Sequence, residues 1–309
     1  MAVVPRLLRL RELRLVSAAG AGRPRHLSAA SGLVSAGSFA YVIADDEHHL
    51  GVFSTEDHRR AGRMLRLRRG TLPLEKSARK RRKPDFEALV ALPPFGGYPN
   101  GALFALGSGS TPNRRSAVLL ALNADGSAHG PPRAISLHNW FTRLRREFGE
   151  VNLEGALVEG ESLTLLQRGN KGSPRNARVR IALAPVLDAI ARRRSLPAPR
   201  LADVTDFDLG AFDEAPLCFT DGAALPGGGF VFTAVAEATE DSYADGDCVG
   251  AAIGIVGADD RLCALWQLEP ALKVEGIEAR VSSNGLELTV VTDADRASVP
   301  AQLLTVTLR

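Results

Sequence analysis

A short phrase recurs along the chain: an acidic residue, then alanine or glycine, then an apolar stretch. Clear copies start at Glu87, Glu154, Asp221 and Glu275, and a weaker copy has Ser31 in place of the acid. Successive copies lie 56, 67, 67 and 54 residues apart, and 65 residues lead from Glu275 through the C-terminus round to Ser31. Spacings of this length indicate repeated structural units. Five similar steps that close on themselves predict five units in a ring.

Short apolar or alternating runs follow each copy, bounded by Gly, Asp, Asn or Pro. Such runs are typical of β-strands joined by turns, and the segments NADG and SSNG are typical hairpin turns. A blade of four strands needs about 40–50 residues. The sequence therefore predicts an all-β fold, a five-bladed β-propeller. We expect one domain over residues 1–309, with blades starting near residues 31, 87, 154, 221 and 275.

Residues 6–16 (RLLRLRELRLV) alternate like a strand, with a phase slip near Arg11 and Glu12 that a β-bulge would cause. The last unit shows only three strands, so residues 6–16 are expected to supply its fourth strand and close the ring. An independent N-terminal helix is the alternative, although no capping residue precedes it. Two short helical insertions are also predicted, at residues 139–148 and 185–194.

The formal net charge of +3 hides an uneven distribution. Residues 59–83 carry twelve Lys and Arg side chains against the single acid Glu75. This basic segment fits either a solvated surface loop or a docking site for an anionic partner. It contains no aromatic residue that could stack on a base, so a nucleic-acid partner is not expected.

Apolar runs are too short for the ~20 residues of a membrane span, and arginines interrupt the leucine-rich N-terminus. We therefore expect no membrane association and a cytoplasmic location. The three cysteines have no metal-binding spacing and predict no disulfide framework.

In a propeller, the first strand of each blade starts at the same channel mouth where the second strand ends. The repeated acids Glu87, Glu154, Asp221 and Glu275 are therefore expected to converge there. Carboxylates in a narrow space repel one another unless a cation or a proton is present. Oxygen ligands of this kind favour calcium or magnesium. Alternatively, each acid accepts hydrogen bonds from backbone N–H groups at its strand start, and both interpretations predict recurrence.

Two pairs of segments carry a family resemblance: NLEGALV with LTLLQRGN, and VEGIEA with LTVVTDAD. They resemble the phytase-like or esterase-like β-propellers and the related calcium-binding, SdiA-regulated bacterial propellers. The nearest match is an uncharacterised bacterial family, and the resemblance spans nearly the whole chain. It implies calcium at the channel, held by the four repeated acids. Phytases of this architecture hydrolyse phosphomonoesters with calcium-held water, but this chain lacks their dense acidic loops.

Two functions follow as hypotheses. The first is a calcium-dependent hydrolase of phosphoester or ester substrates, in which the metal orients a water molecule. In this hypothesis Arg168, Asn170 and Asp45, at the ends of second strands, bind the substrate. Asp293 or Glu278 acts as the general base. The alternative is a non-catalytic propeller that binds a small-molecule or anionic ligand, or a partner, at the mouth.

Overall fold

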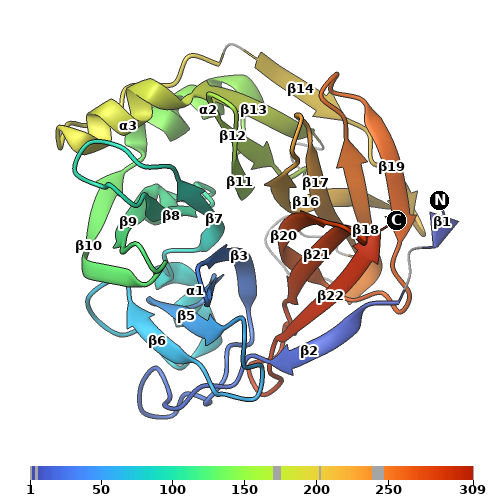
Figure 1. Ribbon diagram of the computed structural model, residues 1–309, viewed down its shortest axis with the longest axis horizontal. Coiled ribbons are helices and arrows are strands. Elements are labelled where there is room, and N and C mark those ends of the chain that lie inside the picture. The colour runs from blue at the N-terminus through green and yellow to red at the C-terminus, as the bar shows by residue number, and fades with distance from the viewer. Residues whose placement is uncertain (1, 4–5, 170–174, 202, 239–246, 309) are drawn as a thin grey trace.

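In this computed structural model, five β-sheets surround a common axis (Figure 1). The structure describes all residues except 1, 4–5, 170–174, 202, 239–246 and 309. The innermost strands contact one another in a closed circle. The order around the circle is β3, β7, β11, β16, β20 and again β3. The predicted all-β, five-bladed propeller is therefore confirmed.

The first three blades each consist of four consecutive antiparallel strands. Blade 1 contains β3 (Ala30–Ala36), β4 (Phe39–Ala44), β5 (His49–Ser54) and β6 (Arg63–Arg66). Blade 2 contains β7 (Phe86–Leu92), β8 (Ala102–Gly107), β9 (Ser116–Leu122) and β10 (Ala128–Ser136). Blade 3 contains β11 (Leu153–Glu159), β12 (Ser162–Gln167), β13 (Asn176–Ala182) and β14 (Asp203–Phe207).

The last two blades recruit additional strands. Blade 4 contains β16 (Ala215–Ala224), β17 (Phe230–Ala238), β18 (Asp247–Val256) and β19 (Leu262–Gln267), flanked by β15 (Ala211–Phe212) and β1 (Ala2–Val3). Blade 5 contains β20 (Val274–Ser282), β21 (Gly285–Thr292), β22 (Gln302–Leu308) and the N-terminal strand β2 (Leu8–Glu12).

The N-terminal strand closes the ring as predicted. β2 pairs antiparallel with β22 as the outermost strand of blade 5, and its register shifts between Arg9 and Arg11. This β-bulge explains the phase slip in the sequence, because one extra residue on one strand interrupts the alternation. Closure by main-chain hydrogen bonds ties the first strands to the last and covers the edge of β22.

Apolar packing between neighbouring blades forms the core. Each of five buried clusters draws its side chains from two adjacent blades, so the clusters alternate with the sheets around the ring. Central strands are therefore covered on both faces. This explains why β8 (ALFALG) is apolar throughout and buried at every position.

Helices α2 (His138–Phe148) and α3 (Leu183–Ala191) correspond to the two predicted insertions. Both bury apolar side chains, Trp140 and Val186 among them, in the cluster between blades 2 and 3. α3 starts earlier than predicted because Leu183 is also buried, and Pro185 still lies in the first turn, where a missing N–H removes no helical hydrogen bond.

A third short helix was not predicted. α1 (Lys76–Arg82) lies within the basic segment, and its N-terminus is capped by the Glu75 carboxylate, which accepts hydrogen bonds from the N–H groups of Ser77 and Ala78. The single acid of residues 59–83 therefore has a local structural role. Its pKa is lowered by these hydrogen bonds.

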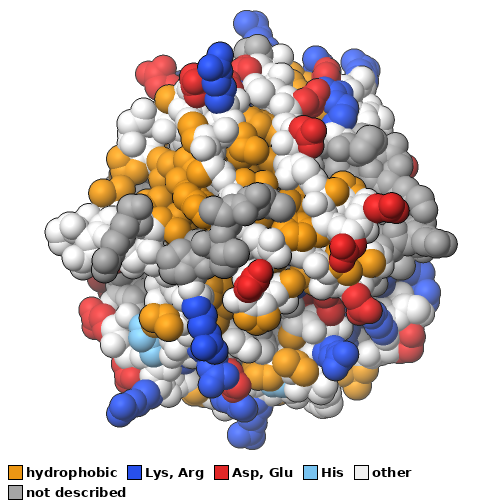
Figure 2. Space-filling model, turned by 90° about the vertical axis from the view of Figure 1, so that its right-hand side faces the viewer, with side chains coloured by type: hydrophobic (Ala, Val, Ile, Leu, Met, Phe, Trp, Pro, Cys, Tyr) orange, Lys and Arg blue, Asp and Glu red, His pale blue; other side chains and the backbone are white. Residues whose placement is uncertain are grey.

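The outer face of the ring near β19 carries hydrophobic side chains among charged ones (Figure 2). Leu262 on this strand is 38% exposed, as suits the outer part of a blade. No helix among the described residues is long and apolar enough to span a lipid bilayer.

Candidate functional site

A cavity of about 1040 Å³ opens at the mouth where the inner strands start. Its described lining is densely charged, with twelve acidic and nine basic side chains. The acids are Asp45, Asp46, Asp85, Glu87, Glu150, Glu154, Asp213, Glu214, Glu237, Glu275, Asp293 and Asp295. The bases are Lys76, Arg79, Lys80, Lys83, Arg114, Arg145, Arg168, Lys273 and Arg296. The opposite charges nearly balance, so the mouth is polar without being uniformly acidic.

A β-bulge interrupts the register of each inner strand, near the start of the strand in four blades and in the middle of β16 in blade 4. The residues at this bulge are Ser31 in blade 1, Glu87 in blade 2, Glu154 in blade 3, Thr220 in blade 4, and Glu275 with Gly276 in blade 5. All of these except Thr220 and Gly276 line the cavity. The recurring phrase therefore marks the bulge, although in blade 4 the acid lies one residue further along.

The small residue of the phrase permits close approach of neighbouring inner strands. A Cβ atom on Gly276 would lie 2.7 Å from the backbone nitrogen of Leu33, and one on Gly32 would lie 3.0 Å from that of Leu89. Such contacts with backbone leave little room for a side chain. Glycine is thus explained by packing around the axis.

Asp221 lies outside the cavity lining and is only 1% exposed. Its carboxylate accepts a hydrogen bond of 3.1 Å from the Ile277 N–H of blade 5. Burial raises the pKa of Asp221 well above its usual range, while this hydrogen bond acts in the opposite direction. Of the four predicted metal ligands, this one has the arrangement expected of a backbone cap.

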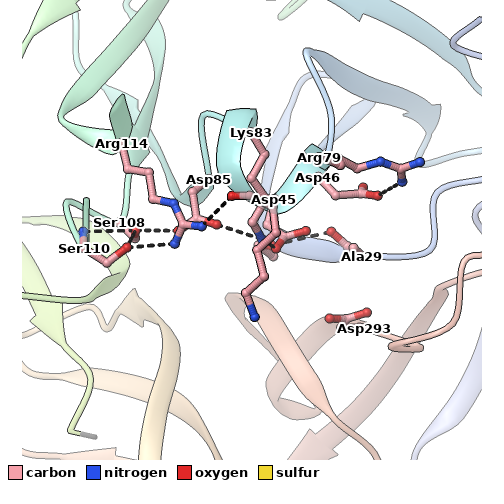
Figure 3. Close-up of polar contacts among 12 residues, drawn as sticks. Ala29, Asp45, Asp46, Arg79, Lys83, Asp85, Ser108, Ser110, Arg114 and Asp293 are labelled. Carbon is pink, nitrogen blue, oxygen red and sulfur yellow. Dashed lines mark hydrogen bonds and ion pairs between the residues drawn. The ribbon is translucent and has the colours of Figure 1, made fainter. Parts of the chain in front are cut away.

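Lys83 neutralises the carboxylates between blades 1 and 2. Its ammonium forms an ion pair with Asp45 and lies 2.7 Å from Asp85. Asp85 also pairs with Arg114 at 2.8 Å and accepts a hydrogen bond from Ser108. Figure 3 shows this group converging from both blades.

Arg79 extends the same network at the surface of blade 1. It pairs with Asp46 at 2.7 Å and donates to the carbonyl of Pro73. The basic segment 59–83 therefore supplies two internal counter-charges at the mouth, Arg79 and Lys83. From the sequence, only solvent or an external partner was predicted to contact these side chains.

Lys273 and Arg168 neutralise the opposite side of the mouth. The ammonium of Lys273 lies between 2.8 and 3.9 Å from four carboxylates, those of Glu237, Glu275, Asp293 and Asp295. Arg168 pairs with Glu237 at 2.8 Å and with Glu154 at 3.6 Å. Each buried cation thus serves several acids at once.

Several mouth carboxyls titrate far from their usual range. Burial raises the pKa of Asp45 to about 6, of Glu154 to about 7 and of Asp293 to about 8, in each case against the attraction of a neighbouring cation. Burial, with repulsion from other acids, also raises the pKa of Glu87 well above its usual range. Asp45, Glu154 and Asp293 therefore change protonation near neutral pH, which general acids and bases require.

The predicted catalytic residues lie in different places. Asp293 lines the cavity and faces the Asp45 side of the mouth (Figure 3). Glu278 is not among the lining residues, and its carboxylate accepts a 2.6 Å hydrogen bond from the Ser35 N–H of blade 1. Asp45 and Arg168, predicted to bind substrate, both line the cavity, whereas Asn170 lies outside the described residues.

Only one group of described acids, histidines or cysteines brings three candidate ligand atoms within 4.8 Å of one another, namely Asp45, Asp85 and Glu87. Three carboxylates are suitable ligands for calcium. However, the Lys83 ammonium already pairs with two of them. A metal ion fits here only if Lys83 turns away, and the predicted set Glu87, Glu154, Asp221 and Glu275 remains untested.

Sequence reasoning missed Lys83, Asp85 and Lys273, which are central to the mouth. Each lies two or four residues before a repeated acid: Lys83 and Asp85 precede Glu87, and Lys273 precedes Glu275. A charged residue shortly before the repeated acid was therefore the available signal.

The chain belongs to a family of unknown function (DUF6929), which matches residues 26–308. No curated protein matches it. Similar solved structures include a luciferin-regenerating enzyme, at 9% identity and a TM-score of 0.44 with 92% of each chain covered. Another is an α-L-arabinofuranosidase from Fusarium graminearum, at 10% identity and a TM-score of 0.43, covering 100% of this chain and 98% of that one. Likeness at this level assigns no chemistry to this protein.

Proposed function

We propose that the channel mouth binds a small polar molecule. The observation that carries this proposal is a large cavity whose charged lining is already paired internally, through Lys83, Arg168 and Lys273. Such a lining offers many hydrogen-bond donors and acceptors in fixed positions, at little further cost of ordering side chains. A concave site with convergent polar groups is the usual form of a small-molecule site.

A thermal-shift and calorimetric screen of small polar compounds tests the proposal. We expect a compound that binds wild type saturably to bind Glu154→Gln more weakly, because Glu154 lines the cavity. Asp221→Asn is the matched control, since Asp221 is a buried acid outside that lining. Equal affinity for wild type and Glu154→Gln across all compounds found would place the binding site elsewhere, and finding no compound would count against the proposal.

Hydrolysis of an ester or phosphoester is a second candidate, favoured by the raised pKa values of Glu154 and Asp293. At neutral pH a carboxyl with a pKa of about 8 is mostly protonated, so Asp293 suits a general acid that donates a proton to the leaving group. This reverses the role of base assigned to it from sequence. Glu278 has no part in this scheme, because it lies away from the cavity.

Turnover of p-nitrophenyl acetate and p-nitrophenyl phosphate tests this candidate. If the mouth is hydrolytic, Asp293→Asn should abolish turnover while Glu278→Gln leaves it nearly unchanged. Absence of turnover in wild type at every pH between 5 and 9 would rule out the hydrolytic candidate, and ligand binding would be the only proposed function left.

Calcium remains part of the proposal, with Asp45, Asp85 and Glu87 as the residues that would hold it. Its chemistry would be to polarise a bound oxygen. Because Lys83 competes for the same carboxylates, we expect calcium to stabilise Lys83→Met more than wild type. Lys76→Met, an exposed lysine at the same mouth, is the control. A calcium-dependent rise in melting temperature, reversed by chelator, measures this. The phytase-like kinship and the cytoplasmic location likewise remain predictions.

A further inference from the structure

Arg145 is a cation of the mouth for which the described residues offer no carboxylate partner. It lies on α2 and lines the cavity, and its guanidinium donates a 3.1 Å hydrogen bond to the carbonyl of Ser110. Its Nε is buried and has no hydrogen-bond partner in the described part of the chain. A nearby acid of the same helix, Glu147, is engaged by Arg143 and Arg175 at 3.8 Å each.

A second arginine interacts with Arg145 electrostatically. The Nε of Arg115 is also buried without a hydrogen-bond partner among the described residues, although Arg115 does not line the cavity. Burial and the charge of Arg145 lower the pKa of Arg115, so the two guanidinium groups repel each other electrostatically. Unpaired buried donors cost free energy, and two nearby positive charges add to that cost. An anion at this position would remove both costs.

Arg114 marks the boundary between this group and the acidic part of the mouth. It donates to the Ser110 Oγ at 2.8 Å and pairs with Asp85 at 2.8 Å, as Figure 3 shows. Ser110 therefore lies between a neutralised arginine and an unpaired one. The positive charge left over beside Ser110 belongs to Arg145.

We propose that Arg145 binds the anionic group, a phosphate or a carboxylate, of the small molecule that occupies the mouth. This inference rests on the proposed binding function and specifies the class of ligand. A guanidinium presents paired donors that match an oxyanion. Arg168, assigned this role from sequence, is engaged by Glu154 and Glu237.

Calorimetric titration with inorganic phosphate and, separately, with acetate tests the inference, at constant ionic strength set by potassium chloride. We expect one of the two ions to bind wild type saturably and Arg145→Gln about tenfold more weakly, because a charge-assisted hydrogen bond is lost. Arg145→Lys keeps the positive charge without the paired donors of a guanidinium, so its affinity for the ion should lie between those of wild type and Arg145→Gln. Arg146→Gln, exposed on the same helix, should bind like wild type.

The outcomes separate the two proposals. Binding of phosphate identifies a phosphate-bearing ligand, and binding of acetate alone identifies a carboxylate-bearing one. If neither ion binds, or if Arg145→Gln and Arg146→Gln lose affinity equally, the anion site is overturned. A polar compound from the screen that still depends on Glu154 would then leave the binding function intact. Unchanged circular dichroism of each variant confirms that it is folded.

Discussion

The bulge of the fourth inner strand differs from the bulges of the second, third and fifth. In those three, the residue at the bulge is a glutamate that lines the mouth. In blade 4 the bulge residue is Thr220, whose hydroxyl donates to the carbonyl of Val274, and Asp221 follows it. A one-residue offset on a strand moves a side chain to the other face. The same phrase therefore yields a mouth carboxylate in three blades and a buried cap in the fourth.

This difference shows that recurrence determines where an acid lies along the chain, while local register determines what it contacts. The three mouth glutamates depend on Lys83, Arg168 and Lys273 for neutralisation. Asp221 depends instead on a backbone N–H and on protonation. Substitutions among the mouth residues and at Asp221 should therefore change the free energy of unfolding by different amounts and with different pH dependence.

Removing the shared cation should have the largest effect. Lys273→Met leaves four carboxylates without their ammonium, and breaking a buried ion pair in this way costs about 3–5 kcal/mol. Urea unfolding at pH 7 measures the loss, which should shrink at pH 5, where the acids take up protons. Arg261→Gln, at an exposed surface pair, is the control. A loss below about 1 kcal/mol would contradict the role of Lys273.

Removing the blade 4 cap should cost less and leave the mouth unaffected. Asp221→Ala deprives the Ile277 N–H of its acceptor, which costs about 1–3 kcal/mol. Asp221→Asn keeps an acceptor without a charge and should be nearly neutral, since burial already favours the uncharged acid. Thermal and urea unfolding compare the two variants. If Asp221→Asn lost as much stability as Asp221→Ala, the negative charge of Asp221 would be what stabilises the fold.

Stability should fall as pH rises through the mouth carboxyl pKa values. Folding raises the pKa of Asp293 to about 8 and of Glu154 to about 7, so the folded state holds more protons than the unfolded chain between about pH 4 and 8. The stabilising contribution is complete below about pH 4 and is lost toward pH 8. We expect a fall of several kcal/mol from pH 5 to pH 8, since one pKa unit is worth about 1.4 kcal/mol.

The control for this pH dependence is Asp293→Asn, which should flatten the profile. Urea midpoints at several pH values between 5 and 8 measure it. A profile that rises with pH in this window would mean that the carboxyls are ionised in the folded state.

The smallest effect is expected at the bulge of blade 1. With the described residues, the hydroxyl of Ser31 makes only a long hydrogen bond of 3.5 Å, to the carbonyl of Ala29. Ser31→Ala should change the free energy of unfolding by less than about 0.5 kcal/mol. Urea unfolding measures this. A larger loss would show that the bulge itself needs a polar side chain, which would weaken the contrast between blades.

Much of the fold was predictable because strands and blades are local and periodic. The alternation of residues 6–16 and its slip near Arg11 predicted both β2 and its bulge. Helix α1 was missed because a run of like charges masks helical propensity, and its signal was the capping position of Glu75. The charge partners were harder to predict, since Lys83 and Asp45 lie in different blades.

The sequence by itself determined the ring: five spaced phrases, apolar strands between turns, and an N-terminal strand that completes the last blade. Only the tertiary structure decided the chemistry of the mouth. Whether an acid there faces a metal, a lysine or a backbone N–H depends on the register of a single bulge and on which cation a neighbouring blade extends. Those contacts join residues far apart in the chain, and electrostatic effects between them depend on distance and burial, which no local pattern encodes.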